Sequence, residues 1–447
     1  MSMQASSEIN PADLVTEDRV HHSVYSDPAI FDLEMTRLFG HAWLLLGHQS
    51  QIANPGDYFT TRMGREPVIV TRHRDGSVRV LINRCTHRGT MVCHEAKGNA
   101  GQFVCPYHGW VFDTGGELKS VPVAQGYGAS ASDTFATLGL AHAARVESYR
   151  GFVFASLAGE GPTLKEFLGP IASSFDDLVD RAPEGEIEIA GGVFKHAYNG
   201  NWKLMLENHL DGVHPNYVHA SSVDGARAAA DSAPGQPGAE RYAEISLRQM
   251  RQNGAPEPVW EALGIWASEW GHGFMGDYHS DSRLVAAMNH PAFAEYRRRL
   301  EARTGANEAE RILNVSRFNT VVYPNVSFMS QYRQLRIVHP LAVDRTVVYT
   351  YNIRLKGAPE QMFRDTVAFS NVVNGTASWV LTDDLEVYER IQRGLTAVTP
   401  EWVYLGRGAG ADVQEASGFR RGASGTSEVF IRRQFEAWRK YMAEKSP

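Results

Sequence analysis

Two short stretches, each with one cysteine and one histidine, lie within NRCTHRGTMVCHEAKGNAGQFVCPYHGW, residues 83–110. The pairs are Cys85 with His87 and Cys105 with His108. Two thiolates and two imidazoles could hold tetrahedral zinc, but zinc-finger spacing places both cysteines in one half and both histidines in the other. Here each half supplies one of each. This favours a two-iron, two-sulfur cluster with the thiolates on one iron and the imidazoles on the other, and leaves a structural zinc site as the alternative.

A second group of possible ligands lies in NWKLMLENHLDGVHPNYVH, residues 201–219. Asp211 and His214 are three residues apart, which predicts that they share one face of a helix. Pro215 prevents a regular continuation of that helix, so a break there could bring His219 back toward His214. Two histidines and one carboxylate form the facial triad that holds Fe(II) with positions open for O2. Capping or packing at a helix end is the alternative role for these histidines.

The carboxylate must come from another segment, and SWVLTDDLEVYERIQRGL offers Asp383 and Asp384. Adjacent helical residues point about 100° apart, so the two aspartates cannot both face one metal. An inward stripe near Asp384 is indicated by Val380, Leu381, Val387 and Ile391. Two solvated surface charges are the alternative.

The elements that carry these residues predict an α+β protein with two regions. Residues 41–158 contain short alternating segments broken by turn residues, which predicts a small antiparallel β domain that holds both Cys-His loops. Residues 1–40 and 159–447 form a larger domain with longer helical patterns and an antiparallel sheet, an arrangement we expect to be helix-grip-like.

Within the larger domain, residues 317–355 predict consecutive antiparallel strands with turns at residues 323–325 and around Pro340. Residues 362–394 predict one long helix that ends at Gly394. The Ala/Gly/Pro-rich run at residues 224–239 predicts a mobile loop or lid.

Composition limits the possible functions. The 447 residues are 43% hydrophobic with a net charge of −7, and no basic run is interleaved with aromatics, so no nucleic-acid partner is expected. There is no apolar run of about 18 residues and no apolar N-terminal leader, which predicts a cytoplasmic protein without membrane association. Three cysteines cannot form a disulfide framework, so paired Cys and His are better interpreted as metal ligands.

CTHRG and CPYHGW together resemble the boxes of Rieske proteins, in particular of the Rieske non-haem iron oxygenases. Respiratory Rieske proteins carry an extra cysteine in each box, and these form a disulfide. Thr90 and Tyr107 stand at those places here, which favours the low-potential form of the [2Fe-2S] cluster. Cys93 remains as a small buried thiol.

The segment with Glu-Asn followed by Asp-x2-His-x4-His is similar to the iron-binding segment of the oxygenase large subunits. The resemblance implies that His214 and His219 bind mononuclear Fe(II), with Asp384 of the Asp-Asp pair as the third ligand. It also implies that Asp211 links the two metal centres by hydrogen bonds and that Asn208 is a polar neighbour of the iron. Trp202 is expected to pack in the core.

The resemblance implies an aromatic-ring-hydroxylating dioxygenase that gives a cis-dihydrodiol. It also implies electrons from NAD(P)H through a separate reductase and ferredoxin, a small beta subunit, and an α3β3 or α3 assembly in which His108 of one copy faces Asp211 of the next. GRGAGAD, residues 406–412, is incomplete as a nucleotide fingerprint and is not expected to follow a strand. A Rieske monooxygenase or demethylase acting on an aromatic substrate, and a pure electron carrier, remain alternatives.

The substrate is the least specified part of this prediction. The stretches YPNVSFMSQYRQLRIVHPLAVDRT and TDDLEVYERIQRGL are similar to large subunits that act on benzoate-like acids. A carboxylate substrate needs a cation, and Arg333 or Arg336 could supply it. Both lie on the predicted strand three residues apart, facing opposite sides, and a structural role is the alternative for each.

Overall fold

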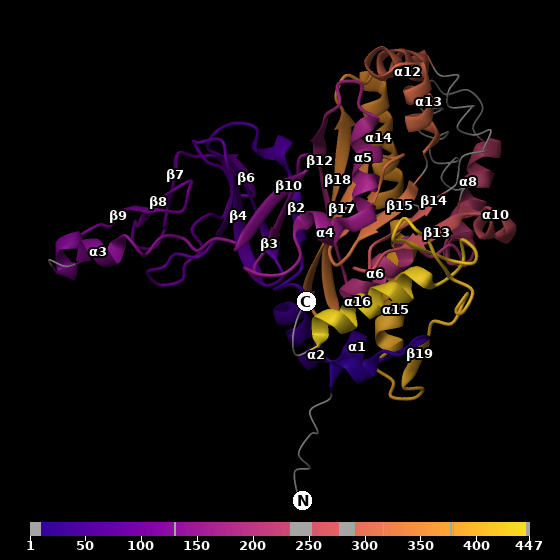
Figure 1. Ribbon diagram of the computed structural model, residues 1–447, viewed down its shortest axis with the longest axis horizontal. Helices are drawn as coiled ribbons and strands as arrows, with labels where there is room; N and C mark the ends of the chain where they lie inside the picture. Colours follow the sequence, from indigo (N-terminus) through magenta and orange to yellow (C-terminus); the bar gives the residue numbers. More distant parts are fainter. Residues whose placement is uncertain are drawn as a thin grey trace, which may run out of the picture. The chain divides into compact units, whose positions relative to one another are not determined.

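The computed structural model describes residues 10–128, 131–232, 253–276, 291–315, 317–375, 378 and 380–443. The chain divides into two compact units (Figure 1). The smaller unit spans residues 35–164, and the larger unit combines residues 1–34 with residues 165–447.

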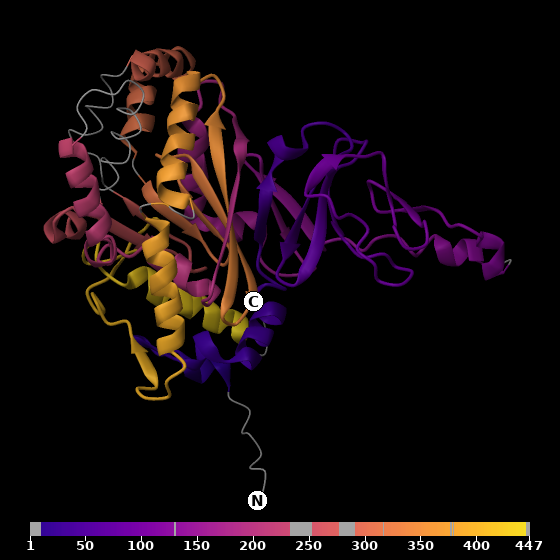
Figure 2. The ribbon, with the colours of Figure 1, turned by 180° about the vertical axis from the view of Figure 1, so that it is seen from behind.

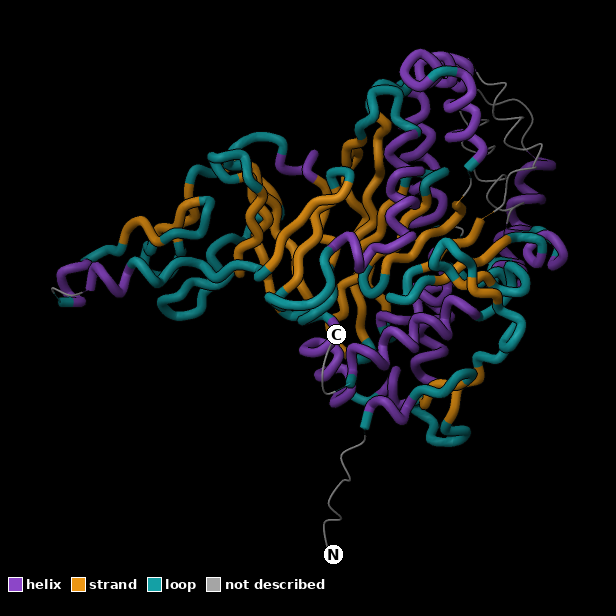
Figure 3. Tube along the Cα trace, in the orientation of Figure 1, coloured by secondary structure: helices purple, strands orange, loops and turns teal. Residues whose placement is uncertain are grey.

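The smaller unit is built almost entirely from short strands and loops (Figure 3). All its strand pairs are antiparallel, in three sheets ordered β10-β11-β2, β5-β4-β3-β6 and β7-β8-β9. This confirms the small antiparallel β domain. The strands are β2 (Leu44–His48), β3 (Asp57–Met63), β4 (Glu66–Arg72), β5 (Val78–Ile82), β6 (Lys97–Asn99), β7 (Gln102–Val104), β8 (Val111–Asp113), β9 (Leu118–Ser120), β10 (Arg145–Tyr149) and β11 (Phe152–Ser156).

The core of the smaller unit includes both Cys-His loops. Ile69 and Leu81 project from β4 and β5 and are fully buried in one cluster with Phe112, Cys85 and Cys105. Alternate strand residues point to one face, so the apolar side chains of neighbouring strands gather on the same side. The two cysteines are thus fixed in a packed apolar environment.

The larger unit is built on one antiparallel sheet, ordered β12-β18-β17-β16-β15-β14-β13-β21-β20. The long strands β17 and β18 form a hairpin near one edge of the sheet, and the edge strand β12 pairs with β18 along almost its whole length. The strands are β12 (Ile187–Tyr198), β13 (Gly264–Ala267), β14 (Gly273–Gly276), β15 (Arg317–Val322), β16 (Val326–Met329), β17 (Gln334–Ala342), β18 (Arg345–Leu355), β20 (Val413–Gln414) and β21 (Arg420–Arg421).

The turns between these strands differ in part from the prediction. The turn at residues 323–325 is confirmed, but a second turn at residues 330–333 was missed. The turn expected around Pro340 is wrong, because Pro340 lies in β17 and the hairpin turn is formed by Val343 and Asp344. The register of the hairpin shifts between Pro340 and Ala342, and such an irregularity tolerates a residue without an N–H.

Helices pack on both faces of the large sheet. On one face, His209 at the end of α6 contacts Ser327 of β16. On the other face, Phe175 of α5 packs against Phe328, the next residue of β16, with ring centroids 4.9 Å apart. The α+β class with a sheet flanked by helices is therefore confirmed. The helices of this unit include α5 (Ala172–Asp180), α6 (Trp202–His209), α7 (Pro215–Val218), α8 (Ala220–Ser232), α14 (Glu360–Asn374) and α15 (Leu381–Gly394).

The single helix predicted over residues 362–394 is wrong, because two successive helices occupy this segment (Figure 2). α14 ends at Asn374 and is followed by Gly375, whose residue type is unfavourable in a helix. The Ser378 hydroxyl donates to the Val373 carbonyl and accepts from the Leu381 N–H at the start of α15. The predicted end at Gly394 is confirmed.

The loop predicted over residues 224–239 is wrong for its first part. α8 continues to Ser232, since its alanines favour helix more strongly than its one glycine opposes it. Residues 233–239 lie outside the described residues.

A buried acid connects the N-terminal segment to α6. Glu34 is fully buried and accepts hydrogen bonds from Lys203 Nζ (2.6 Å), Trp202 Nε1 (2.9 Å) and Trp438 Nε1 (2.7 Å). The predicted core packing of Trp202 is confirmed, because its side chain is fully buried. These bonds fix the start of the helix that leads into the histidine segment.

Candidate metal centres

The two Cys-His loops of the smaller unit have the same backbone turn. In the first, the Cys85 N–H donates to the Thr90 carbonyl (2.8 Å) and the Gly89 N–H donates to the Cys85 carbonyl (2.9 Å). In the second, the N–H groups of Cys105 and Gly109 make the corresponding bonds of 2.8 and 3.0 Å. Gly89 and Gly109 have φ of 79° and 70°, a left-handed conformation that side chains with a Cβ rarely adopt.

The four side chains of these loops lie together. The rings of His87 and His108 have centroids 4.6 Å apart, and Cys85 and Cys105 are each 2% exposed. Burial, together with the neighbouring Cys105 thiol, raises the pKa of Cys85. Nδ1 of both histidines is buried and has no hydrogen-bond partner among the described residues. Two buried thiols beside two orphaned imidazole nitrogens fit a [2Fe-2S] cluster, which would satisfy all four.

The surroundings of the loops agree with a cluster that has no covering disulfide. All three cysteines are free. Cys93 is 7% exposed, which confirms it as a buried thiol. The indole of Trp110 stacks on the His87 ring, with centroids 4.8 Å apart and planes inclined by 3°.

In the larger unit, the helix predicted to carry Asp211 and His214 on one face ends before both residues. α6 ends at His209, so Asp211 lies in the turn that follows, and His214 is the N-cap of the short helix α7. Pro215 is the first residue of α7, where its missing N–H costs no hydrogen bond. His219 caps the other end, and the two imidazole centroids lie 5.6 Å apart. The break at Pro215 thus brings the histidines together, as expected.

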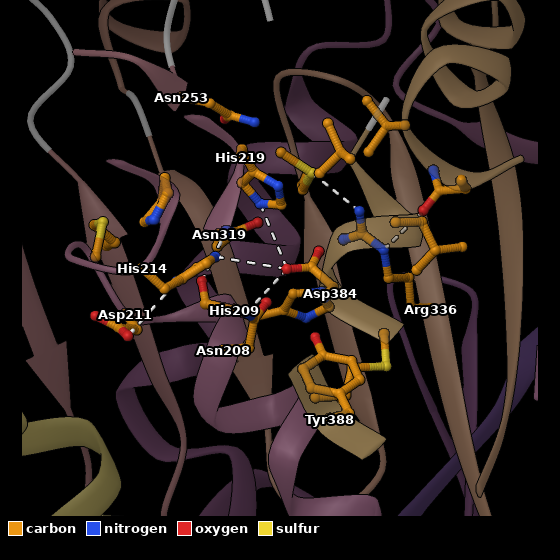
Figure 4. A pocket seen from close by; sticks show the side chains of 18 of the residues that line it. Asn208, His209, Asp211, His214, His219, Asn253, Asn319, Arg336, Asp384 and Tyr388 are labelled. Carbon is orange, nitrogen blue, oxygen red and sulfur yellow. Dashed lines mark hydrogen bonds and ion pairs between the residues drawn. The ribbon is translucent and has the colours of Figure 1, made fainter. Parts of the chain in front are cut away.

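Asp384 completes this group from the first turn of α15. One possible ligand atom from each of His214, His219 and Asp384 lies within 4.8 Å of the others (Figure 4). Asp384 Oδ1 is 3.4 Å from His219 Nε2 and 3.9 Å from His214 Nε2. Two imidazoles and one carboxylate at these separations fit a mononuclear Fe(II) site.

The inward stripe of α15 differs in composition from the prediction. Its buried positions are Leu381, Asp384, Tyr388 and Gln392, whereas Ile391 is 39% exposed. Two of the four buried residues, Asp384 and Gln392, are polar, because this face meets polar partners. Gln392, for example, bonds to the backbone of Tyr25 and Asn201. Asp384 faces inward as expected.

Each of the three possible ligands has a second polar neighbour. Asn208 Nδ2 donates to Asp384 Oδ1 (3.2 Å), and Asp211 Oδ2 lies 3.6 Å from His214 Nδ1. Asp383 points away from Asp384, with its Oδ2 3.3 Å from His219 Nδ1. A carboxylate at Nδ1 holds the proton there and leaves Nε2 free for a metal.

The charges of this group follow from its burial and contacts. Burial opposes ionisation of Asp211, but the neighbouring His214 outweighs it and keeps the pKa of Asp211 below its usual value. Burial likewise disfavours protonated His214, yet Asp211 and Asp384 raise the pKa of His214. A metal can bind Nε2 of His214 only when that nitrogen carries no proton, so metal binding competes with protonation there.

A pocket opens beside these residues, and its wall comes from both the sheet and the helices (Figure 4). Its apolar part is formed by residues that include Met205, Met275, Met329, Val373, Val380 and Trp260. The apolar walls could hold a hydrophobic ring next to the candidate iron site and exclude water from it.

The two arginines predicted as possible partners of a substrate carboxylate lie in different places. Arg336 is on β17, as predicted, and lines this pocket. Arg333 is not on the strand, since it lies in the missed turn at residues 330–333 with a φ of 54°. Its guanidinium donates to Thr366 Oγ1 and to the carbonyls of Gln331 and Met362. Arg333 is structural, and only Arg336 stays a candidate.

The polar residues of the site that sequence reasoning missed include Asp383 as a partner of His219, Ser222, His196 and Asn374. Ser222 Oγ donates to Asp383 Oδ2 (2.9 Å), which fixes that carboxylate. His196 and Asn374 line the pocket from β12 and α14. The adjacent aspartates and the alternation of β12 were visible signals for Asp383 and His196. The break after Asn374 had only a weak local signal, namely Gly375.

Known proteins share both units of this chain. Residues 42–141 match the family described as Rieske [2Fe-2S] domain, and residues 182–444 match that described as ring hydroxylating alpha subunit (catalytic domain). Toluate 1,2-dioxygenase subunit alpha of Pseudomonas putida is 36% identical over 396 residues, which cover 85% of this chain and 81% of the relative. The chain belongs to the Rieske ring-hydroxylating dioxygenase large subunits.

Two further comparisons agree with this family. The 2-halobenzoate 1,2-dioxygenase large subunit of Burkholderia cepacia is 33% identical to this large subunit, over 88% of this chain and 80% of the relative. A solved structure of naphthalene 1,2-dioxygenase with indole in its active site superposes with a TM-score of 0.80 at 29% identity. The superposition covers 97% of this chain and 94% of the naphthalene dioxygenase chain.

The family defines the cofactors and the reaction class. This large subunit is an aromatic-ring-hydroxylating dioxygenase whose cofactors are a Rieske [2Fe-2S] cluster and mononuclear non-haem iron. Both donor sets described above fit these groups. Among the described residues, no helix is long and apolar enough to cross a membrane.

The glycine-rich run at residues 406–412 differs from its expectation in one respect. It does follow a short strand, β19 (Trp402–Tyr404), but turns rather than a helix follow it. A dinucleotide fingerprint needs a helix N-terminus at that place, so this run provides no nucleotide site.

Proposed function

We propose that this large subunit adds both atoms of O2 to the ring of a benzoate-like aromatic acid and so forms a cis-dihydrodiol. The observation that carries this proposal is the convergence of His214, His219 and Asp384 on one side of a largely apolar pocket. The relatives that act on toluate and on 2-halobenzoate support an aromatic acid as the substrate.

In this proposal, Cys85, His87, Cys105 and His108 hold the [2Fe-2S] cluster, within a Rieske domain of residues 41–158. His214, His219 and Asp384 hold the mononuclear iron, within a catalytic domain of residues 1–40 and 159–447. The bound groups supply the chemistry that cannot come from side chains, namely single-electron delivery by the cluster and activation of O2 at the iron.

The protein's own residues position and shield these groups. The Asn208 amide occupies one lone pair of Asp384 Oδ1 and orients the carboxylate toward the histidines. Asp383, held by Ser222, keeps the proton of His219 on Nδ1. Apolar walls such as Met205, Val380 and Trp260 hold the ring and exclude water, so that electrons are used on the substrate.

Asp211 is the proposed link between the two metal centres. It lies beside His214, and its carboxylate is one-third exposed, so a group from another chain could reach it. We infer that His108 of a neighbouring copy supplies that group in a trimer of large subunits. A small beta subunit would make this trimer α3β3, and a ferredoxin or reductase using NAD(P)H would reduce the cluster in the cytoplasm.

The test is turnover of benzoate by the purified chain with its electron-transfer partners in the presence of ¹⁸O2. The expected product is a cis-dihydrodiol with both hydroxyl oxygens labelled, from an enzyme with about three irons per chain. A product with one labelled oxygen would instead indicate a monooxygenase or demethylase. About two irons per chain and no product would indicate a pure electron carrier.

A variant separates the two metal centres in the same assay. His214→Ala should retain the visible spectrum of the cluster but lose mononuclear iron and product formation. Retention of full activity would remove His214 from the iron site.

A further inference from the structure

A buried guanidinium with an unused donor lies in the wall of the pocket. Arg336 is 5% exposed, and its Nη2 donates to Gln334 Oε1 (3.0 Å) and approaches Met329 Sδ at 3.5 Å. Its Nε donates to Asn374 Oδ1 (3.4 Å). Nη1 is buried and has no hydrogen-bond partner among the described residues. A buried donor without a partner destabilises the folded state, and more so when it is charged.

The charge of Arg336 is not paired either. No carboxylate oxygen of the described residues lies within 4.0 Å of its nitrogens. Burial lowers the pKa of Arg336 to about 10, so the side chain is still a cation at neutral pH. Asp384 attracts it from further away, but this aspartate is also the proposed iron ligand. Iron bound to Asp384 would engage that carboxylate and leave the guanidinium without a local counter-ion, which an anionic ligand would supply.

Two more unused N–H groups line the same pocket. Asn374 is 3% exposed, and because its Oδ1 accepts from Arg336, its amide nitrogen is left without a partner among the described residues. His196 of β12 lacks partners at both ring nitrogens, within that same part of the chain. Burial, with a smaller effect of Arg336, lowers the pKa of His196 to about 4, so its ring is neutral and offers one N–H.

The sheet register places His196 and Arg336 on one face. Arg336 pairs with Thr350 of β18, whose partner on β12 is Phe194, two residues before His196. Positions two apart on a strand share a face, so both side chains project toward the pocket. Asn374 reaches it from the end of α14. Three separate elements therefore direct unused donors into one cavity.

We propose that Arg336, Asn374 and His196 form a subsite that binds the carboxylate of the aromatic acid, while the apolar wall holds its ring beside the iron. This inference rests on the proposed function and deepens it, because it assigns the substrate's charge to particular donors. A planar carboxylate can accept from guanidinium Nη1 and the Asn374 amide together, which selects acids over neutral arenes.

The test measures binding of labelled benzoate and of toluene to the iron-loaded enzyme by equilibrium dialysis, and uses the ratio of the two dissociation constants. Arg336→Met removes the cation at similar length. Asn374→Asp is nearly isosteric and places a carboxylate against Arg336 Nε, which pairs the cation internally and repels benzoate. Arg333→Lys is the matched control, since it changes a buried arginine that already has three hydrogen-bond acceptors.

Both Arg336→Met and Asn374→Asp should weaken benzoate binding more than toluene binding. The dissociation constant of benzoate divided by that of toluene should therefore rise at least about 30-fold, as expected for lost charge-assisted hydrogen bonds. Arg333→Lys should leave the ratio within threefold of the wild type. Iron content and the visible cluster spectrum verify that each variant is folded and loaded.

An unchanged ratio in Asn374→Asp would overturn the subsite, and so would wild-type enzyme that binds toluene but not benzoate. The first result would leave the proposed aromatic-acid substrate in place, whereas the second would overturn that substrate as well. The dioxygenase assignment fails separately if no arene gives a doubly labelled diol. Failure of the two proposals is thus distinguishable.

Discussion

Asn208 Nδ2 donates a 3.2 Å hydrogen bond to Asp384 Oδ1, although the two residues are 176 positions apart in the chain. The bond joins the end of α6 to the first turn of α15. Asp384 lies on α15, whereas His214 and His219 flank α7, which follows α6 after a short turn. The iron site therefore depends on the packing of two distant segments.

Removal of Asp384 should abolish the mononuclear site and leave the cluster intact. Asp384→Ala leaves two imidazoles, too few for a facial triad, so we expect loss of about one iron per chain. Iron analysis together with the visible spectrum measures both centres. Full activity with normal iron content would place the third ligand elsewhere.

Asp383 should influence iron affinity without binding the metal. Because it orients His219 through Nδ1, Asp383→Ala should weaken Fe(II) binding about 10- to 100-fold, as measured by chelator competition. Glu386→Ala is the control on the same helix, since Glu386 is exposed and forms an exposed ion pair with Arg390. Equal iron affinity in the two variants would show that Asp383 has no orienting role.

Asp211 should matter for electron transfer more than for metal binding. Asp211→Asn keeps a side chain of the same size next to His214 but removes its charge, so both metal contents should stay normal. We expect the cluster to be oxidised much more slowly in stopped-flow single-turnover experiments. A near-normal rate would show that the connection between the centres runs through another residue.

The buried acid Glu34 should contribute strongly to stability. Glu34→Ala leaves Lys203 as an uncompensated buried charge and two indole N–H groups without an acceptor, which should cost about 3–5 kcal/mol of unfolding free energy. Urea unfolding measures the loss. Glu308→Ala, which breaks the exposed pair with Arg311, should change stability by less than about 1 kcal/mol.

Acid should destabilise the larger unit through His272. Its Nε2 donates to the Phe167 carbonyl, its Nδ1 accepts from the Tyr323 N–H, and burial lowers its pKa to about 4. The unfolded chain binds a proton below about pH 6.5, whereas folded His272 does not until about pH 4. Stability is therefore complete above pH 6.5 and falls as pH decreases between these values.

Between pH 7.5 and 5.0 this group alone should cost about 2 kcal/mol. Urea unfolding of the wild type and of His272→Gln at both pH values measures it, because the variant should lose less stability over the interval. The same loss in both proteins would mean that His272 is not held neutral.

Several features of the fold were predictable because they depend on local sequence. The alternation of residues 41–158 and of residues 317–355 predicted antiparallel strands correctly. The break at Pro215 followed from the missing N–H of proline. The prediction was wrong where local signals were weak, as in the helix break after Asn374 and the turn at residues 330–333.

The sequence by itself determined the chemistry of the two metal centres, since the ligand types lie in short segments whose spacing restricts the metal they can hold. Only the tertiary structure decided which side chains meet. Asp384 faces the histidines, whereas Asp383 contacts His219 at Nδ1. Arg336 lines the pocket, whereas Arg333 lies outside it and donates to backbone carbonyls. These choices depend on contacts between distant strands and helices, where one residue of shift reverses the direction of a side chain.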